Sequence, residues 1–354
     1  MAEHKNQHFV PRCHFKPFTS GQEGKAINLF NIGQAKAIPK VPVKGQCSKN
    51  YFYGADLTLE KSFQNLEGNY STILQKLLTG NETTHADIGF LADFAYFQSR
   101  RTQVAIDRMR ESANIVKDAV FEGHDEQRPN GGLDDDSLIK DSLKMFFESR
   151  HYIEDLKKCF VRNETVRSFV TSDDPAIITN KFFMQKFHRS NFGLASSGAI
   201  LLMPLSPTFL LLCYDGGVYT IPDTQNGFVI VKKEADVFAF NELQYLKASE
   251  NVYFENWAEA AQMKAEFEFV KPRRPESWVT LTKLVQFSED DEGANFRKAT
   301  DQEFLTAPKT MILQSASYPS PSSWPSPLKF RNPPKTFSNG SGIGLVRKKE
   351  YLQG

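Results

Sequence analysis

The spacing of apolar residues changes along the chain and separates a helical part from a β-rich part. Between residues 58 and 78, apolar side chains recur at every third or fourth position, which predicts an amphipathic helix that begins near Thr58 and stops near Gly80. A second helical pattern runs from about residue 85 to 122, long enough to allow a kink, and a third from about residue 135 to 156. The helical part therefore spans about residues 57–157.

Beyond residue 158 the apolar period shortens to that of β-strands. Short apolar runs at 199–203 and 209–213 are separated by turn sequences, including Asp215-Gly216-Gly217. Late helical patterns follow at 233–247 and 257–267. We therefore predict an α+β fold with an extended N-terminal strand, a helical middle region, and an antiparallel sheet with the late helices on one face. The β-rich part spans about residues 158–271, and residues 1–271 are predicted to form a single domain.

The two ends of the chain lack these strong periods. Residues 7–18 alternate loosely and contain Pro11 and Pro17, which favours an extended segment or edge strand. In such a strand His8, Val10 and Arg12 share one face. Residues 315–336 are dense in Ser and Pro, so residues 272–354 are predicted to be a poorly structured extension with a flexible Pro/Ser-rich tail.

Composition narrows the class of protein. The 43 Lys and Arg residues nearly balance the 42 Asp and Glu residues, so a chain-wide basic surface for nucleic acid is excluded, although a local basic patch is not. The four cysteines have no C-x-x-C spacing, which favours free thiols over a disulfide framework or a zinc site. No apolar run is long enough to cross a bilayer, and the first residues lack the apolar core of a signal peptide. We expect a cytoplasmic protein without a membrane partner.

Two glutamates lie on the first predicted helix. Glu60 and Glu67 are seven residues apart, which places them on one face at a separation of about 10 Å. They are either a carboxylate pair for metal binding or general-base chemistry, or part of a solvated charged face.

Gln98 and Arg101 are three residues apart on the second helix and therefore lie on one face. Because Gln98 continues an apolar stripe, this face either lines a cleft or finds a buried partner. In a cleft, Arg101 can bind a phosphate or carboxylate through two hydrogen bonds. In a buried site, it forms an ion pair, for instance with Glu60 or Glu67.

Asp173 lies in the segment Thr171-Ser172-Asp173-Asp174-Pro175 between two apolar strands. A carboxylate there is either a turn former or an acid–base or metal-binding group on a loop that a rigid sheet positions. His8 is a candidate ligand, general base or structural histidine. Together with Arg12 it gives the N-terminal strand a polar face that is expected to meet these carboxylates.

The run His8-Phe9-Val10-Pro11-Arg12, followed by Phe15 and Phe18, resembles the opening of the bacterial family known as domain of unknown function 4238. The further motifs in matching order are the Glu60/Glu67 helix, residues 97–101, residues 171–175, residues 204–207 and Asn241. The resemblance covers about residues 7–267. It implies a fold and a set of positions to test, because the activity of that family is not established.

The residue types favour a metal-assisted, nuclease-like phosphodiester hydrolase whose partner is a nucleic acid or nucleotide. In this hypothesis, Glu60, Glu67 and Asp173 hold Mg²⁺ or Mn²⁺, which lowers the pKa of a bound water, and an arginine stabilises phosphoryl charge. The predicted catalytic set is His8, Arg12, Glu60, Glu67, Gln98, Arg101 and Asp173. The alternative is a non-enzymatic binding module, in which the same residues form a buried polar network. An effector or toxin of a bacterial defence operon is a further hypothesis about cellular role.

Overall fold

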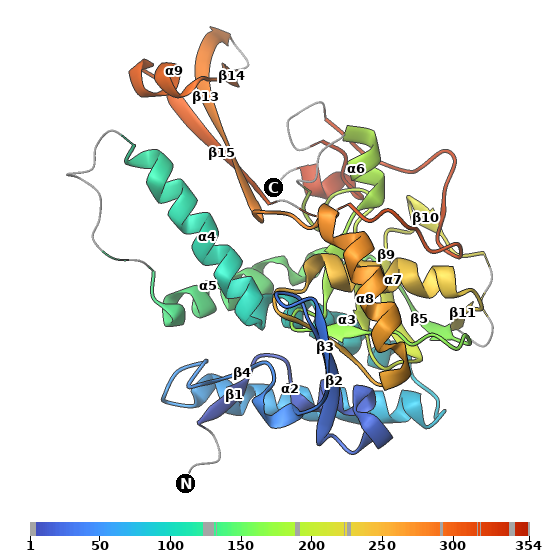
Figure 1. Cartoon of the computed structure of the whole chain (residues 1–354). Helices are drawn as coiled ribbons and strands as arrows, with labels where there is room; N and C mark the ends of the chain where they lie inside the picture. The colour runs from blue at the N-terminus through green and yellow to red at the C-terminus, as the bar shows by residue number, and fades with distance from the viewer. Residues whose placement is uncertain are drawn as a thin grey trace.

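The computed structural model describes residues 5–122, 131, 133–187, 192–222, 224, 228–290, 293–316, 318, 320–339 and 344–352. These residues form a mixed α+β fold, as predicted (Figure 1). The helices are α1 (Arg12–Phe15), α2 (Thr58–Leu78), α3 (His85–Arg101), α4 (Gln103–Val120), α5 (Asp135–Ser149), α6 (Lys181–Phe187), α7 (Glu234–Lys247), α8 (Ala260–Val270) and α9 (Asp301–Thr306).

A five-stranded sheet lies at the centre of the fold. Its strands in spatial order are β11 (Phe228–Val231), β5 (Lys157–Asn163), β9 (Phe209–Tyr214), β8 (Ile200–Pro204) and β7 (Ile177–Thr179). Neighbouring strands are antiparallel except β11, which runs parallel to β5. Because successive side chains of a strand point to opposite faces, Leu201 and Met203 pack with the helical middle region, whereas Ile200 and Leu202 pack with α7. The sheet is therefore covered by α3 on one face and by α7 on the other.

A second antiparallel sheet joins the N-terminal region to the chain after α7. Its strands in order are β3 (Lys36–Pro42), β2 (Ala26–Asn31), β12 (Asn251–Phe254) and β6 (Thr171–Ser172). Helix α8 packs on this sheet, where Phe30 meets Phe267 with ring centroids 5.1 Å apart. A separate pair is formed by β1 (Asn6–His8) and β4 (Ser48–Asn50).

The N-terminal run differs from the predicted strand over residues 7–18. Strand β1 ends at His8, and α1 begins at Arg12 with Pro11 as its N-cap residue. Proline suits a helix start because its φ is fixed near the helical value and its missing N–H is not needed there. As a result, Val10 is buried while Arg12 is exposed, so the predicted shared face of His8, Val10 and Arg12 is wrong.

The predicted long helix over residues 85–122 is broken at Thr102. This residue has an extended backbone, with φ −79° and ψ 155°, between the end of α3 and the start of α4. The Thr102 hydroxyl accepts a hydrogen bond from the Ala105 N–H at 3.1 Å, as an N-cap residue does. Helix α4 therefore starts in a new direction rather than continuing α3 (Figure 1).

The extension after residue 272 contains regular structure, which corrects the prediction of a poorly structured segment. Strands β13 (Val279–Asp290), β14 (Gly293–Lys298) and β15 (Thr310–Ala316) form an antiparallel sheet that projects beside α4 (Figure 1). The chain then returns to the body, where β16 (Lys329–Phe330) pairs with β10 (Tyr219–Thr220). The division into one domain that ends at residue 271 stays a prediction.

Buried carboxylates hold the Pro/Ser-rich stretch against α7. Ser322 and Ser323 donate hydrogen bonds to Glu242 at 2.8 Å, and Ser326 donates to Asp236 at 2.6 and 2.8 Å. Composition predicted flexibility because the stretch has few apolar residues of its own. The stretch is instead fixed by partners that lie about 80 to 90 residues away in sequence.

Two further features concern the cysteines and the apolar character of the helices. All four cysteines are free thiols, as predicted. Within the described residues, no helix combines the length and apolar character needed to cross a membrane.

Candidate functional site

Several predicted site residues meet around the guanidinium group of Arg101, at the end of α3. Its Nη2 donates to Glu67 Oε1 at 2.6 Å and to the backbone oxygen of His8 at 2.9 Å, and its Nε donates to the Tyr53 hydroxyl at 2.9 Å. One turn earlier on α3, Gln98 Nε2 donates to the backbone oxygen of Phe9 at 2.6 Å. We call Arg101, Glu67, Gln98, His8 and Tyr53 the Arg101 cluster. It connects the N-terminal run to α2 and α3.

The Arg101 charge is enclosed by protein. Its side chain is fully buried, and its Cζ lies 4.9 to 5.3 Å from the ring centroids of Tyr53, Phe63 and Phe97. Burial opposes the charge, but the Tyr53 hydroxyl and the Glu67 carboxylate keep the pKa of Arg101 above its usual value. The ion pair between Arg101 and Glu67 that the sequence predicted as one alternative is therefore present. Such a pair is costly to break, because it leaves a buried charge without its partner.

Glu60 and Arg12 lie around this cluster rather than within it. Glu60 is half-buried in the first turn of α2, close enough that its charge helps to raise the pKa of Tyr53, for which burial is the main cause. Arg12 is exposed at the start of α1. Burial, with the Arg12 charge as second cause, lowers the pKa of His8 to about 4. The His8 imidazole is therefore neutral at pH 7.

Asp173 lies at a different point of the fold. Its buried carboxylate accepts hydrogen bonds from the backbone N–H groups of Ser249, Glu250 and Asn251, in the turn between α7 and β12. Burial raises the pKa of Asp173 to about 6, although these three N–H groups act in the opposite direction. Asp173 thus holds a turn, which corresponds to the turn-forming interpretation of its segment.

The three predicted metal ligands are not gathered into one group. Glu67 is engaged by Arg101, and Asp173 is engaged by backbone N–H groups. In the ranges that the structure describes, no three or more His, Cys, Asp and Glu side chains are arranged to hold a metal ion. The Mg²⁺ or Mn²⁺ site at Glu60, Glu67 and Asp173 therefore stays a prediction.

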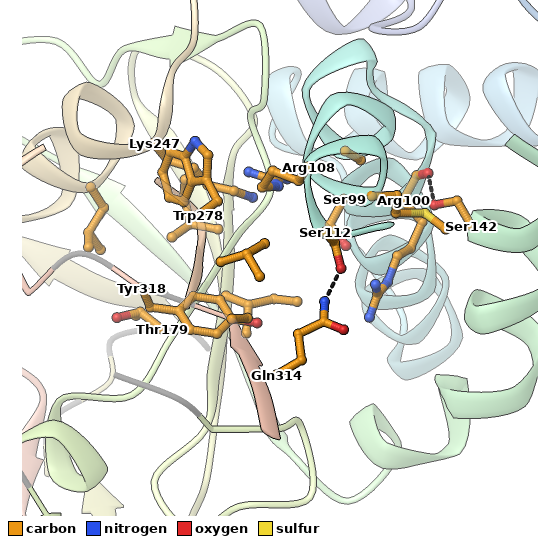
Figure 2. Close-up of a pocket in the computed structure, with 17 residues that line it drawn as sticks. Ser99, Arg100, Arg108, Ser112, Ser142, Thr179, Lys247, Trp278, Gln314 and Tyr318 are labelled. Carbon is orange, nitrogen blue, oxygen red and sulfur yellow. Dashed lines mark hydrogen bonds between the residues drawn. The ribbon is translucent and has the colours of Figure 1, made fainter. Parts of the chain in front are cut away.

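A pocket of about 240 Å³ lies on the other side of α3 (Figure 2). It is bounded by α3, α4, α5, β7, α7 and the chain from residue 278 to 318. We call it the Arg100 pocket and define it by Arg100, Arg108, Thr179, Lys247, Trp278 and Tyr318. In Figure 2, Arg108, Lys247 and Trp278 lie together at one edge of the pocket, and Thr179 and Tyr318 lie at another.

Two cations at this pocket share one carboxylate. Asp174 is fully buried, with Oδ2 2.8 Å from Arg108 Nη2 and 3.1 Å from Lys247 Nζ. Burial alone would raise the pKa of Asp174, but the two cations outweigh it and hold the pKa below its usual value. For Lys247, burial lowers the pKa to about 8 even though Asp174 acts in the opposite direction. At pH 7 the group of three therefore carries a net positive charge.

Arg100 adds a further positive charge. Its Nη2 donates to the Tyr96 hydroxyl at 3.1 Å, but no carboxylate pairs with it among the residues that the structure describes. Its Nε is buried and has no hydrogen-bond partner there. Arg100, Arg108 and Lys247 thus line the pocket with only the Asp174 carboxylate against them. Buried donors normally find an acceptor, so an unpaired guanidinium N–H at a pocket indicates space for an anionic ligand.

The predicted catalytic set contains the neighbours of two of these residues rather than the residues themselves. It includes Arg101 and Asp173, whereas Arg100 and Asp174 face the pocket side. Lys247 gave no distinct local signal, because the helical run that it ends contains several other charged and polar residues. Trp278 and Tyr318 were missed because they lie in the extension that was predicted to be poorly structured.

The family model described as "Protein of unknown function (DUF4238)" matches residues 6–257. The chain belongs to this family. No curated protein and no solved structure matches it. The DUF4238 region supplies Arg100, Arg108 and Lys247, whereas Trp278 and Tyr318 lie beyond it.

Proposed function

We propose that this DUF4238 chain is a non-enzymatic binding protein for a small phosphate-bearing ligand, which it holds in the Arg100 pocket. The observation that carries the proposal is the surplus of positive charge there, above all the buried Nε of Arg100 without a partner. Guanidinium groups bind phosphate oxygens through pairs of charge-assisted hydrogen bonds. The walls of the pocket exclude much of the water that would otherwise screen these charges.

The Arg101 cluster has a structural role in this proposal. Its support is that the Arg101 guanidinium and the Gln98 amide donate to backbone oxygens of the N-terminal run, rather than facing open space. The cluster fastens the first residues of the chain to α2 and α3. The Arg101 cluster corresponds to the buried polar network that the sequence offered as the alternative. Asp173 stabilises a separate turn by accepting backbone hydrogen bonds.

The predicted phosphodiester hydrolysis with Mg²⁺ or Mn²⁺ stays a prediction, as does the role as a defence effector. A purified sample incubated with single-stranded nucleic acid and either metal tests the hydrolysis directly. Under the binding proposal, we expect no cleavage above the buffer control. Cleavage that is lost in a folded Glu67→Ala variant would instead support the hydrolase.

The binding proposal is tested by calorimetric titration of the full chain with inorganic pyrophosphate. Arg100→Gln is expected to weaken binding by about 10- to 100-fold, because one charge-assisted contact is removed. The melting temperature should hardly change, since Arg100 has no carboxylate partner to leave unpaired.

The matched control is Arg110→Gln on α4. Arg110 pairs with Asp107 and Asp135 outside the pocket, so the variant removes the same charge without touching the lining. Its affinity for pyrophosphate should equal that of the wild type. Absence of pyrophosphate binding to the wild type, or equal losses in the two variants, would contradict the proposal.

A further inference from the structure

The Arg100 pocket is lined by two kinds of side chain, cationic and aromatic. The cationic side chains of Arg100, Arg108 and Lys247 come from the region that the family model matches. Two aromatic residues from the chain after that region also line the pocket: Trp278 lies beside Arg108 and Lys247, and Tyr318 lies at another edge (Figure 2). A ligand that fills the pocket therefore meets positive charge and aromatic rings together.

Each aromatic ring is held in place by one protein partner. The Arg108 guanidinium lies over the Trp278 ring, with Cζ 5.3 Å from the centroid. The Tyr318 ring stacks on Phe192, with centroids 4.2 Å apart and an interplanar angle of 21°. Rings that are already fixed lose little further freedom when a planar group packs against them. These two rings therefore suit an aromatic ligand group.

The pocket also offers a hydroxyl without a partner. Thr179 is only 3 % exposed, and its Oγ1 is buried without a hydrogen-bond partner among the described residues. A threonine hydroxyl both donates and accepts. A sugar hydroxyl or a ring nitrogen would satisfy it, whereas a bare phosphate on the cationic side chains would leave it unpaired.

The volume of the pocket limits the size of the ligand. At about 240 Å³ it lies just below the ~300–1,000 Å³ that is typical of small-molecule sites. This is room for one compact molecule rather than for a nucleic-acid strand.

We infer that the ligand is a mononucleotide, with its phosphate groups on Arg100, Arg108 and Lys247 and its base against Trp278 and Tyr318. The inference rests on the proposed function, because anion binding by the cationic side chains is what brings the phosphate groups there. It adds that the chain beyond the DUF4238 region selects for the base.

The test compares inorganic pyrophosphate, ribose 5-phosphate and the diphosphates of adenosine, guanosine, cytidine and uridine, by calorimetry in one buffer. For the wild type, at least one nucleoside diphosphate should bind about tenfold or more tightly than pyrophosphate, because of base stacking. Tyr318→Leu should remove most of that advantage and leave the pyrophosphate affinity nearly unchanged, since among the described residues Tyr318 forms no hydrogen bond or ring contact with Arg100, Arg108 or Lys247.

A second variant and a control make the test specific. Trp278→Leu should also remove the advantage of the nucleotide, with some loss of pyrophosphate affinity because Arg108 packs on this ring. Trp257→Leu removes an indole that is 44 % exposed and stacks on Phe254 away from the pocket, and it should behave like the wild type.

The possible failures are distinguishable. If pyrophosphate binds but no nucleotide binds more tightly, the nucleotide inference is overturned and the anion-binding function stands. If none of the compounds binds, both are overturned. If the nucleotide advantage persists in a folded Tyr318→Leu variant and in a folded Trp278→Leu variant, the two aromatic rings do not hold the base and the inference is likewise overturned. Melting curves for each variant show which of them are folded.

Discussion

Arg100 and Arg101 are consecutive residues of α3, yet their charges are handled in opposite ways. Arg101 is fully buried with Glu67 as its partner, whereas Arg100 lines the pocket and pairs with no carboxylate of the described part of the chain. Neighbours on a helix point about 100° apart, so Arg101 faces Glu67 on α2 and Arg100 faces the pocket. Asp173 and Asp174 show the same division, one holding a backbone turn and the other two cations. In each of these two pairs, one residue therefore stabilises the fold and its neighbour of the same type faces the pocket side.

The largest expected effect on stability concerns the buried Arg101 cluster. Glu67→Ala leaves the Arg101 charge buried without its partner, which should lower the free energy of unfolding by about 3 to 5 kcal/mol. Urea unfolding measures this loss. Glu148→Ala is the control, because its pair with Lys144 is exposed and should contribute less than about 1 kcal/mol. A loss for Glu67→Ala no larger than that of the control would show that the Arg101 cluster is not structural.

The next effect on stability concerns His14, which is buried between Tyr70 of α2 and Thr171 of β6. Its Nδ1 lies 2.9 Å from the Tyr70 hydroxyl and its Nε2 2.8 Å from the Thr171 hydroxyl. Burial lowers the pKa of His14 to about 3. Between that value and the unfolded pKa of about 6.5, the unfolded chain binds a proton that the folded chain does not. The contribution of His14 to stability is therefore present above pH 6.5 and is lost as the pH falls, by about 2 to 4 kcal/mol.

Stability measured from pH 7 to pH 4 for the wild type and His14→Gln isolates this effect. The raised pKa of Asp173 favours the folded state as the pH falls, but it does so equally in both proteins. His14→Gln should therefore show a smaller loss of stability in acid than the wild type. Parallel pH profiles would contradict the prediction.

Asp174→Asn tests the pocket side. The substitution removes the carboxylate that Arg108 and Lys247 share, but Lys247 is able to release its proton, so we expect a moderate loss of about 1 to 3 kcal/mol. Pyrophosphate should then raise the melting temperature of the variant more than that of the wild type, because the ligand replaces the missing negative charge. An equal or smaller rise would place the anion away from this pair.

Arg12→Ala should have the smallest effect. Because Arg12 is exposed and touches the cluster only through its charge, stability should change by less than about 0.5 kcal/mol. The pKa of His8 should rise from its lowered value, since the Arg12 charge is one of the causes of that lowering. Chemical shifts of the His8 ring measured against pH report this change directly, and an unchanged pKa would contradict it.

Local patterns predicted much of the fold and one part of the polar network. Helix α2 begins and ends where the apolar period does, at Thr58 and Leu78. The pairing of Arg101 with Glu67 was also accessible, because Gln98 and Arg101 share a face that is largely apolar and a charge there requires a partner. These features depend on residues within one or two elements.

The pocket depends on contacts that no local pattern reveals. Arg108 and Lys247 are 139 positions apart and meet only because both pair with Asp174. The described residues between 278 and 318 are held by pairing between β13 and β15 and by contact with α4, not by a strong period of their own. The sequence therefore predicted the residues that stabilise the fold more readily than those that line the pocket.

The break between α3 and α4 at Thr102 affects where Arg100 and Arg108 lie relative to each other. In an unbroken helix, Arg100 and Arg108 would stand about 12 Å apart along one straight rod. The extended backbone at Thr102 ends α3 and starts α4 in a new direction. The Thr102 hydroxyl, which caps α4, also donates a hydrogen bond to Asp174 at 3.3 Å. The side chain of Thr102 thus has two roles. It caps α4 at the corner between the two helices, and it connects that corner to the carboxylate that pairs with Arg108 and Lys247.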